Sequence, residues 1–519
     1  MNSTETRHPK DIKDVLLKSH SVSMNDFIAV ARYGAKVSFS QDYCDRVNHS
    51  RHLVEKCLEE NRLIYGITTG FGDNVTQVIS PKDAERLQRN IVRSHAVSVG
   101  DSLEKEVVRA TQLMMLISLG QGYSGVRLDV LQLIASLLNH DVMPFVPGDG
   151  SVGYLGPEAH MALVLMGEGL VLDQGELIPG KEALKKAGLE PVTLGCKEGL
   201  ALTSGTTSVM AHALLALYNG IQSAKTADIA GAMSLEALKG TLKAFDPRYH
   251  SVKRHKEQAG TAENILRILD GSDITEKYKD FRLQDAHSLR CIPQMHGAAK
   301  KALKDALDTI MDEMGSTGDN PIIYPEGDDG IGLMGGNFDG SYVGIYSDAM
   351  CIAMANLAKI SERRGDRLVN QHFSGLPNFL TANPGLNNGY MIPQYTAAGL
   401  LGEIKVLSHP ATVDSVSTSA GQEDPVTFAY LASKKAYTIS KKLEYILAIE
   451  LMAAAQALDF HGTLQPSLAS KAAYNLIRSR VPIVEEDRYF YPDIESIKEQ
   501  IHEGDILRAV ENVVGELQF

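Results

Sequence analysis

Hydrophobic residues dominate long stretches of the second part of the chain, where alanine and leucine recur at helical spacing without strand-like alternation. One stretch contains Ala453-Ala-Ala-Gln-Ala-Leu, a run of strong helix formers. Several of these segments are longer than about twenty residues, which is typical of a bundle of long helices. Helices are predicted over residues 206–240, 260–269, 295–314, 340–363, 390–408 and 425–459.

The first part of the chain alternates shorter helical runs with glycine-rich breaks at 65–72, 148–160 and 199–205. Glycine and proline do not propagate a helix, so these breaks are predicted to be loops, and loops held by rigid helices are where binding and catalysis concentrate. We therefore expect one continuous, mainly α fold, with a loop-rich active-site region over 1–205 and a long-helix bundle over 206–519. Shorter helices are predicted near 41–60, 82–99, 103–119, 126–140 and 157–170, after a helix that Ser23 or Asn25 could cap.

The composition limits the class of partner. The 519 residues are 44% hydrophobic, enough for a large core, and they carry a net charge of −13. An acidic surface repels nucleic acids and anionic membranes, so neither is expected as a partner.

Residues 1–20 lack the apolar core of a signal peptide, and no stretch approaches about 18 consecutive apolar residues. We therefore expect a cytoplasmic protein.

The five cysteines are an odd number and show no C-x-x-C spacing. This pattern argues against a disulfide framework and against a structural zinc site, so reduced thiols and no metal are expected. The cysteines are Cys44, Cys57, Cys196, Cys291 and Cys351.

The turn at 148–160 contains Gly150-Ser-Val-Gly153 and, further on, Pro157, Ala159 and His160. With these residues the chain resembles the histidine and aromatic amino acid ammonia-lyases over nearly its whole length. The resemblance implies an ammonia-lyase-like bundle of long helices and a homotetramer whose active sites draw residues from more than one subunit. In that family, an Ala-Ser-Gly tripeptide after the turn cyclises into the methylidene-imidazolone electrophile. Here Gly153 is followed directly by Tyr154-Leu-Gly156, so the tripeptide is missing and no cofactor is expected.

Further motifs match the family around the expected site. The resemblance implies that Tyr65, on its glycine-rich loop, lies over the substrate and handles a proton, and that His95 in Ser-His-Ala contributes to the site. In Gln284-Asp-Ala-His-Ser-Leu-Arg290, the arginine would clamp the substrate carboxylate, because a guanidinium offers two parallel donors. His287 stands where the family has a tyrosine. Without the resemblance, these residues would be read as an ordinary loop tyrosine, a core histidine and a surface arginine.

Four other positions complete the expected site. Ser204 replaces the asparagine that accompanies the electrophile in the family, and Phe338 lies in a Gly-Gly-Asn-Phe motif, although a core role is commoner for phenylalanine. Glu423, in Gln-Glu-Asp, matches the glutamate that faces the imidazole ring in histidine ammonia-lyases. Lys405, should it enter the pocket, would pair with an anion or donate to the substrate ring.

The missing tripeptide and the altered asparagine together favour a substrate that needs no covalent capture of its amine. A trimethylammonium betaine has no nitrogen lone pair and leaves as neutral trimethylamine. With an imidazole-facing glutamate, this predicts elimination of trimethylamine from ergothioneine, the thio-imidazole betaine of histidine, to give thiourocanate, as in the family's ergothionases. Tyr65 would remove the β proton, while Lys405 and Glu423 would stabilise charge on the ring.

Two alternatives stay open. The chain could be a histidine or aromatic amino acid ammonia-lyase whose cyclised tripeptide, as a non-standard residue, is not written in the sequence. It could also be a non-catalytic relative that binds a ligand through the same pocket. Retention of Tyr65, Arg290 and Glu423 argues against the non-catalytic reading.

Overall fold

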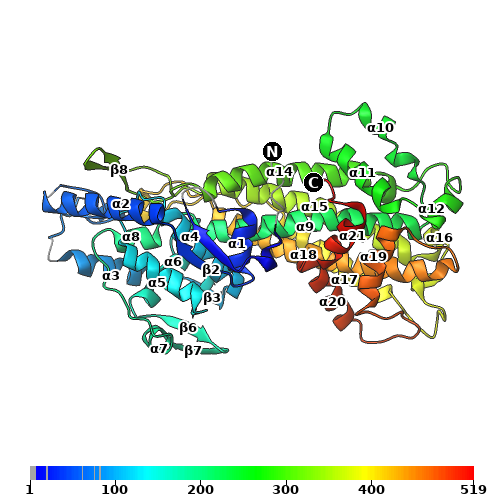
Figure 1. Cartoon of the computed structure of the whole chain (residues 1–519), viewed down its shortest axis with the longest axis horizontal. Helices are drawn as coiled ribbons and strands as arrows, with labels where there is room; N and C mark the ends of the chain where they lie inside the picture. The colour runs from blue at the N-terminus through cyan, green and yellow to red at the C-terminus, as the bar shows by residue number, and fades with distance from the viewer. Residues whose placement is uncertain (1–6, 19–21, 61, 75, 81–82) are drawn as a thin grey trace. The chain divides into compact units, whose positions relative to one another are not determined.

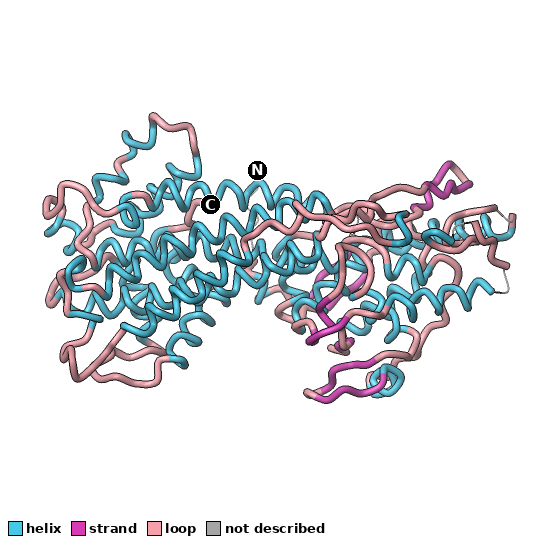
Figure 2. The backbone as a smooth tube through the Cα atoms, turned by 180° about the vertical axis from the view of Figure 1, so that it is seen from behind, coloured by secondary structure: helices cyan, strands magenta, loops and turns pink. Residues whose placement is uncertain are grey.

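The computed structural model describes residues 7–18, 22–60, 62–74, 76–80 and 83–519. Helices make up most of these residues, which confirms the prediction of a mainly α fold (Figures 1 and 2). Of the segment inspected for a signal peptide, residues 1–6 and 19–20 lie outside the described residues.

The chain packs into two compact units, each described here by itself. Unit 1 comprises Met1–Leu215, Asp308–Ser347 and Pro410–Lys434, and unit 2 comprises Ala216–Leu307, Asp348–His409 and Lys435–Phe519. This grouping follows contacts in space and joins later segments to the first part of the chain. The predicted division of the sequence near residue 205 therefore stays a prediction.

Unit 1 contains helices and every strand found among the described residues (Figure 2). The predicted cap of the first helix is confirmed: the Asp26 N–H donates to the Ser23 hydroxyl at 3.1 Å, and the Ser23 N–H donates to the Asp26 carboxylate at 3.2 Å. The helices are η1 (Pro9–Asp11), α1 (Met24–Ala31), α2 (Gln41–Glu59), η2 (Gly72–Asn74), α3 (Ala84–His95), α4 (Lys105–Leu119), α5 (Leu128–Asn139), α6 (Pro157–Leu165), α7 (Gly180–Lys186), α8 (Glu198–Thr203) and η6 (Ser419–Gly421).

The strands of unit 1 are short and form small separate sheets. β1 (Asp14–Leu17) pairs in parallel with β2 (Lys36–Phe39), and β3 (Val99–Ser102) pairs antiparallel with β5 (Pro147–Asp149). The antiparallel order β4-β6-β7 joins Met143–Pro144, Leu170–Asp173 and Glu176–Pro179, and β8 (Ile322–Glu326) forms a hairpin with β9 (Asp329–Leu333). The sequence did not predict these strands, because each is too short to show a clear alternation.

Four long helices contribute residues to both units and match predicted segments: α9 (Thr207–Ala237), α14 (Ile292–Met314), α15 (Ser341–Val369) and α18 (Ala429–Leu458). The described residues of unit 2 otherwise form only shorter helices and loops. These helices are η4 (Leu242–Phe245), α10 (Pro247–Ser251), α11 (Lys256–Leu269), α12 (Asp273–Tyr278), α13 (His287–Arg290), α16 (Gln371–Ser374), η5 (Asn378–Leu380), α17 (Met391–Leu407), η7 (Asp459–His461), α19 (Leu468–Arg478), α20 (Tyr491–His502) and α21 (Asp505–Val514).

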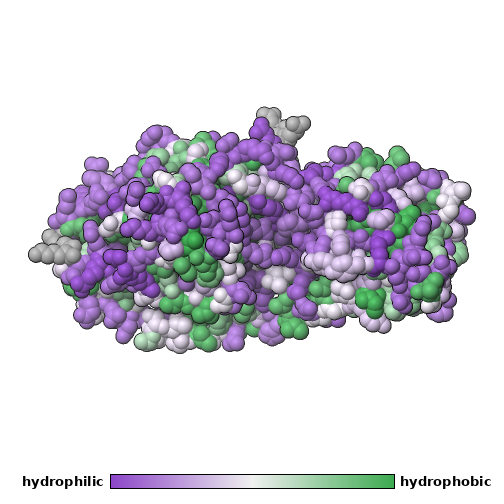
Figure 3. Space-filling model, turned by 90° about the horizontal axis from the view of Figure 1, so that it is seen from below, coloured by the Kyte–Doolittle hydropathy of each residue, from purple (hydrophilic) through white to green (hydrophobic). Residues whose placement is uncertain are grey.

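Two helical segments are long and apolar enough to cross a membrane by length and composition alone. In Glu198–Ala237 the apolar window is 94% buried within the protein, and in Ser341–Val369 it is 61% buried. Such burial is typical of core helices and accounts for their hydropathy. On the face drawn in Figure 3, hydrophilic residues predominate and hydrophobic ones form separate patches. The expected cytoplasmic location stays a prediction.

Candidate active site

An open cavity of about 860 Å³ lies in unit 1. Its wall comes from segments that are far apart in the sequence: the loop before η2, the end of α3, the turn before α6, the end of α8, the loop after β9 and the loop around η6. Among the predicted site residues, the cavity brings together Tyr65, His95, Ser204, Phe338 and Glu423.

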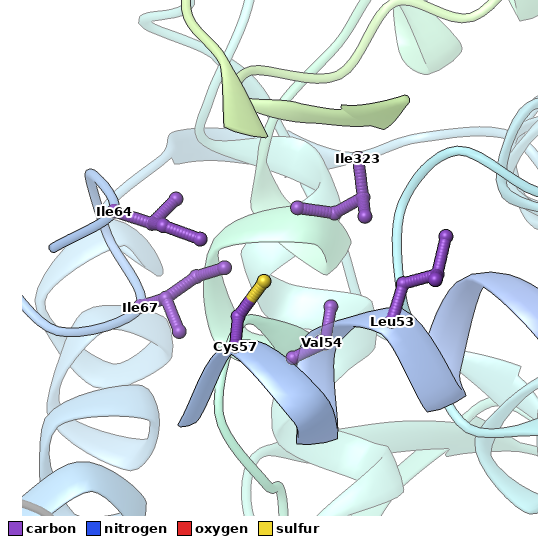
Figure 4. Packing of buried hydrophobic residues seen from close by; sticks show 6 residues of the cluster. All are labelled: Leu53, Val54, Cys57, Ile64, Ile67 and Ile323. Atoms are coloured by element: carbon purple, nitrogen blue, oxygen red, sulfur yellow. The ribbon is translucent and has the colours of Figure 1, made fainter. Parts of the chain in front are cut away.

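The loop that carries Tyr65 is anchored by apolar residues on both sides of the tyrosine. Ile64 and Ile67 point into a buried cluster that this loop forms with α2 and β8 (Figure 4). Burying an isoleucine side chain contributes about 1.5–3 kcal/mol, so the backbone next to Tyr65 is held firmly. The cluster consists of Leu53, Val54, Cys57, Ile64, Ile67 and Ile323.

The Tyr65 hydroxyl is held from within the same loop. The backbone N–H of Gly72 donates to the Tyr65 oxygen at 2.9 Å, and the Phe71 ring meets the Tyr65 ring edge-on at 6.0 Å between centroids. The hydrogen bond fixes the position of the Tyr65 oxygen at the cavity wall.

The tyrosine loop touches the loop around η6. Gly72 has a φ of +52°, and a Cβ atom added to it would lie 2.7 Å from the Ser419 hydroxyl. Only glycine combines this backbone conformation with so close an approach. Gly72 thus fixes where the two loops meet.

His95 ends the amphipathic helix α3, whose Leu87, Ile91 and His95 all face the cavity, as the four-residue spacing predicted. Residue 82, the expected start of this helix, lies outside the described residues. The ring Nδ1 of His95 lies 2.8 Å from the Ile91 carbonyl oxygen, which can only accept, so Nδ1 carries the proton. Nε2 is then left as a hydrogen-bond acceptor.

The turn before α6 is tightly wound. Gly150, Gly153 and Gly156 have positive φ values, and Leu155 shares the left-handed region with a φ of +66°. The Ser151 hydroxyl donates to the Leu155 carbonyl at 2.9 Å and closes the turn. A branched side chain in this region costs about 1–2 kcal/mol, so the turn is strained next to the cavity.

The residues of this turn do not fit the prosthetic group of the ammonia-lyases. Gly153 is joined directly to Tyr154, and the sequence contains no Ala-Ser-Gly that could cyclise.

Glu423 is held by a second bent segment. Ser419, Ala420 and Gly421 all have positive φ values, and the Thr418 N–H donates to the Glu423 carbonyl at 2.9 Å across the turn. The Thr418 hydroxyl donates to the carboxylate oxygen Oε2 at 3.0 Å. The turn thereby fixes both the backbone and the carboxylate of Glu423.

Tyr154 contacts both Glu423 and Phe338. Its hydroxyl donates to Glu423 Oε2 at 3.3 Å, and its ring meets the Phe338 ring edge-on at 4.9 Å between centroids. Burial raises the pKa of the Tyr154 hydroxyl, and the negative charge of Glu423 raises that pKa further. Tyr154 therefore stays a neutral donor at physiological pH. Phe338 is only half-buried at the cavity wall, so it is not a core aromatic.

A buried ion pair supports the wall near Ser204, which follows α8. Lys197, the residue before α8, is fully buried, and its Nζ lies 2.6 Å from Asp319 Oδ2. Asn320, the next residue, lines the cavity, and its Oδ1 accepts the Gly335 N–H at 3.0 Å. The pair thus links the backbone that carries Ser204 to the backbone that carries Asn320.

The other predicted site residues belong to unit 2, and none is among the residues that line the cavity. Gln284 and His287 are exposed, whereas Arg290, at the end of α13, is half-buried with an Nε that has no hydrogen-bond partner among the described residues. Lys405 is exposed in the last turn of α17 rather than buried in a pocket.

Several lining residues were not predicted to belong to the site, among them Tyr154, Thr418 and Asn320. Tyr154 lies within the turn that carries the family resemblance, so its position in the sequence could have marked it as a site residue. Its contact with a glutamate far along the chain was not visible in the sequence. Among the described residues, no group of histidine, cysteine, aspartate and glutamate side chains could hold a metal ion.

The sequence model of the aromatic amino acid lyase family matches residues 22–479. The chain belongs to this family and is therefore a carbon–nitrogen lyase. It is similar to proteins named histidine ammonia-lyase from Gloeobacter violaceus, with 46% identity over 97% of this chain and 98% of the relative, and from Alkaliphilus oremlandii, with 44% identity over 98% and 100%.

A solved structure supports the same fold. The crystal structure of histidine ammonia-lyase from Trypanosoma cruzi superposes with a TM-score of 0.90 at 36% identity, covering 96% of each chain. This likeness confirms the predicted ammonia-lyase fold.

The predicted ergothionase activity is wrong. Ergothionase from Treponema denticola shares the fold, with a TM-score of 0.87, but only 28% identity over 95% of this chain and 99% of that one. The relatives named histidine ammonia-lyase are much more similar over equal lengths. The prediction gave too much weight to one short turn and to Ser204, which are few positions against the whole chain.

Proposed function

We propose that the protein is a histidine ammonia-lyase, which eliminates ammonia from histidine to form urocanate. The observation that carries the proposal is that Tyr65 and Glu423 line the same cavity. Relatives similar to this chain over nearly its whole length are named histidine ammonia-lyase. Glu423 would accept a hydrogen bond from an imidazole N–H of the substrate. An aromatic amino acid such as tyrosine is the second candidate, because the family includes enzymes for such substrates.

Tyr65 would remove the β proton of the substrate. The proton is barely acidic, so the base has to be positioned, and the Gly72 N–H holds the Tyr65 oxygen in place. His95 would assist through Nε2, which can accept a proton or a hydrogen bond, since Nδ1 is committed to the Ile91 carbonyl. Ser204 and Phe338 would bound the substrate on the remaining sides.

The residues of unit 2 would complete the site in a homotetramer. Arg290 offers a guanidinium for the substrate carboxylate, and its buried Nε without a partner is consistent with a ligand that supplies one. Gln284, His287 and Lys405 are exposed in the single chain and so are available to a neighbouring subunit. Sedimentation or light scattering should give a tetramer; a fully active monomer would contradict this part of the proposal.

In one alternative, a cyclised Ala-Ser-Gly stands between Gly153 and Tyr154 without being written in the sequence. Intact mass spectrometry of the purified protein tests it. We expect a mass equal to that of the written sequence, in which Gly153 is joined directly to Tyr154. An excess equal to one doubly dehydrated Ala-Ser-Gly would show that the group is present.

The activity itself is tested by incubating the purified protein with histidine and following ammonia release and the ultraviolet absorbance of a conjugated acrylate. We expect both signals with histidine and much smaller ones with tyrosine or phenylalanine. Turnover of tyrosine or phenylalanine with histidine inert would favour the second candidate and exclude the first.

A further inference from the structure

Glu423 lines the cavity, and its two carboxylate oxygens differ in their hydrogen bonding. Tyr154 and Thr418 both donate to Oε2, at 3.3 and 3.0 Å. Oε1 has no hydrogen-bond partner among the described residues. A carboxylate held at one oxygen by two donors cannot rotate freely about its terminal torsion, so the direction in which Oε1 accepts is fixed.

The two donors to Glu423 come from different segments of the chain. Thr418 belongs to the same bent turn, five positions earlier. Tyr154 comes from the turn before α6, and the Phe338 ring packs against the Tyr154 ring edge-on at 73°. Because Thr418 and Glu423 share one turn, they would move together if that turn shifted. The hydrogen bond from Tyr154 instead fixes the carboxylate relative to a separate part of the cavity wall.

We propose that Tyr154 is a positioning residue that sets substrate specificity: by holding Glu423 Oε2, it aims Oε1 at an N–H of the substrate ring, so that the site prefers an azole ring to a phenyl ring. This inference rests on the proposed function. It adds a residue from the shortened turn to the recognition of the ring. The phenol remains a neutral donor because burial and the adjacent carboxylate both raise its pKa.

The proposal is tested with Tyr154→Phe, which keeps the ring against Phe338 and removes only the hydroxyl. A hydrogen bond to a charged group is worth about a tenfold change in binding or more. We expect KM for histidine to rise about tenfold with kcat changed much less, and the preference for histidine over phenylalanine, as a ratio of kcat/KM values, to fall about tenfold.

A matched control is available in unit 2. The Tyr445 hydroxyl donates to Glu495 Oε1 at 2.7 Å, the same kind of tyrosine–glutamate bond, and neither residue lines the cavity. Tyr445→Phe should leave KM and the substrate preference unchanged. An equal effect of the two substitutions would assign the loss to general destabilisation and overturn the proposal.

A double-mutant cycle separates positioning from simple packing. If Tyr154 acts through Glu423, then Tyr154→Phe should have little further effect on KM in a Glu423→Gln background. Independent effects that add in full would show that Tyr154 contributes without the carboxylate, and the proposal would be wrong.

A binding measurement keeps this test independent of the proposed reaction. Calorimetric titration with imidazole-4-acetate and with phenylacetate requires no turnover. Wild type should favour the imidazole ligand, and Tyr154→Phe should reduce that preference about tenfold. If histidine is not a substrate but the preference falls in this way, the proposed function fails and the inference stands. An unchanged preference overturns the inference whether or not histidine reacts.

Discussion

Two clusters of polar side chains, one in each unit, differ in how completely their hydrogen-bonding groups are occupied. In unit 1, Glu423 at the cavity receives two hydrogen bonds on one oxygen, and its other oxygen has no hydrogen-bond partner among the described residues. In unit 2, Glu450 is buried, and both of its oxygens are occupied: Arg364 donates to them at 2.5 and 2.8 Å. Ser234 and Ser361 donate to the same carboxylate at 2.7 and 2.5 Å.

The unit 2 cluster continues through His296. Its Nδ1 donates to Asp228 at 2.8 Å, and Arg364 Nη1 donates to its Nε2 at 3.3 Å. Lys300 donates to the second oxygen of Asp228 at 2.6 Å. The side chains of His296, Asp228, Arg364 and Lys300 are all buried.

The difference separates structural from functional polar groups. A fully occupied buried network holds helices in one arrangement, and breaking it leaves an uncompensated charge in the core. A carboxylate with one oxygen held and one oxygen facing a cavity is instead prepared to bind. Substitutions in the two clusters should therefore have different consequences, stability in one case and catalysis in the other.

The largest effect is expected for Tyr65→Phe in the cavity. Loss of a general base lowers the rate of the chemical step by about a hundred- to ten-thousand-fold. We expect kcat to fall by this amount while the melting temperature stays close to that of wild type, because the ring still packs against Phe71. Full activity in Tyr65→Phe would show that another group is the base.

Arg364→Met in the closed network should act in the opposite way. Removing one partner of a buried ion pair costs about 3–5 kcal/mol of unfolding free energy, measurable by denaturant titration. The folded fraction should keep the wild-type KM, since Arg364 does not line the cavity. The double variant Arg364→Met, Glu450→Leu should recover part of the stability, because it removes both charges. A changed KM in the single variant would contradict the distinction between the clusters.

Glu423→Gln should weaken recognition of the imidazole ring with a smaller effect than loss of the base. An amide oxygen still accepts a hydrogen bond but lacks the charge, so we expect KM for histidine to rise about tenfold. Steady-state kinetics with histidine and with phenylalanine measure the change. An equal rise of KM for both substrates would mean that Glu423 does not face the ring.

The smallest effect concerns the pH dependence of stability. Burial lowers the pKa of His296 below its usual 6.5, and the nearby Arg364 and Lys300 charges act in the same direction, although Asp228 opposes them. The unfolded state therefore binds this proton at a higher pH than the folded state. The stability that neutral His296 provides is fully present above pH 6.5 and is lost as the pH falls below 6.5. In His296→Gln, the unfolding free energy should fall less steeply between pH 7 and 5 than in wild type; an equal slope would contradict the assignment.

The helical part of the fold was predictable from the sequence because its signal is local. Long apolar segments such as those that form α9 and α18 repeat the helical period over many turns and contain few breakers. The paired strands, by contrast, have only two to five residues each, such as Met143–Pro144 in β4. A segment of that length shows no reliable alternation, and its pairing depends on distant residues.

The candidate site divides in the same way. Tyr65, His95 and Glu423 could be predicted because each lies in a short motif that matches the family. The bond between Tyr154 and Glu423 joins residues 269 positions apart, and no local pattern announces such a contact. The substrate was predicted wrongly because a short deletion was taken as decisive evidence about chemistry.

The contact between Gly72 and Ser419 fixes the distance between two loops that line the cavity. One of the touching loops carries the proposed base, Tyr65, and the other carries Glu423, the proposed partner of the ring, so the span between them is set where Gly72, which has no side chain, meets the Ser419 hydroxyl. A histidine homologue longer by one methylene would have to withdraw its β carbon from Tyr65 in order to keep its ring at Glu423. If Tyr65 and Glu423 act as proposed, the site would select its substrate by length as well as by ring chemistry.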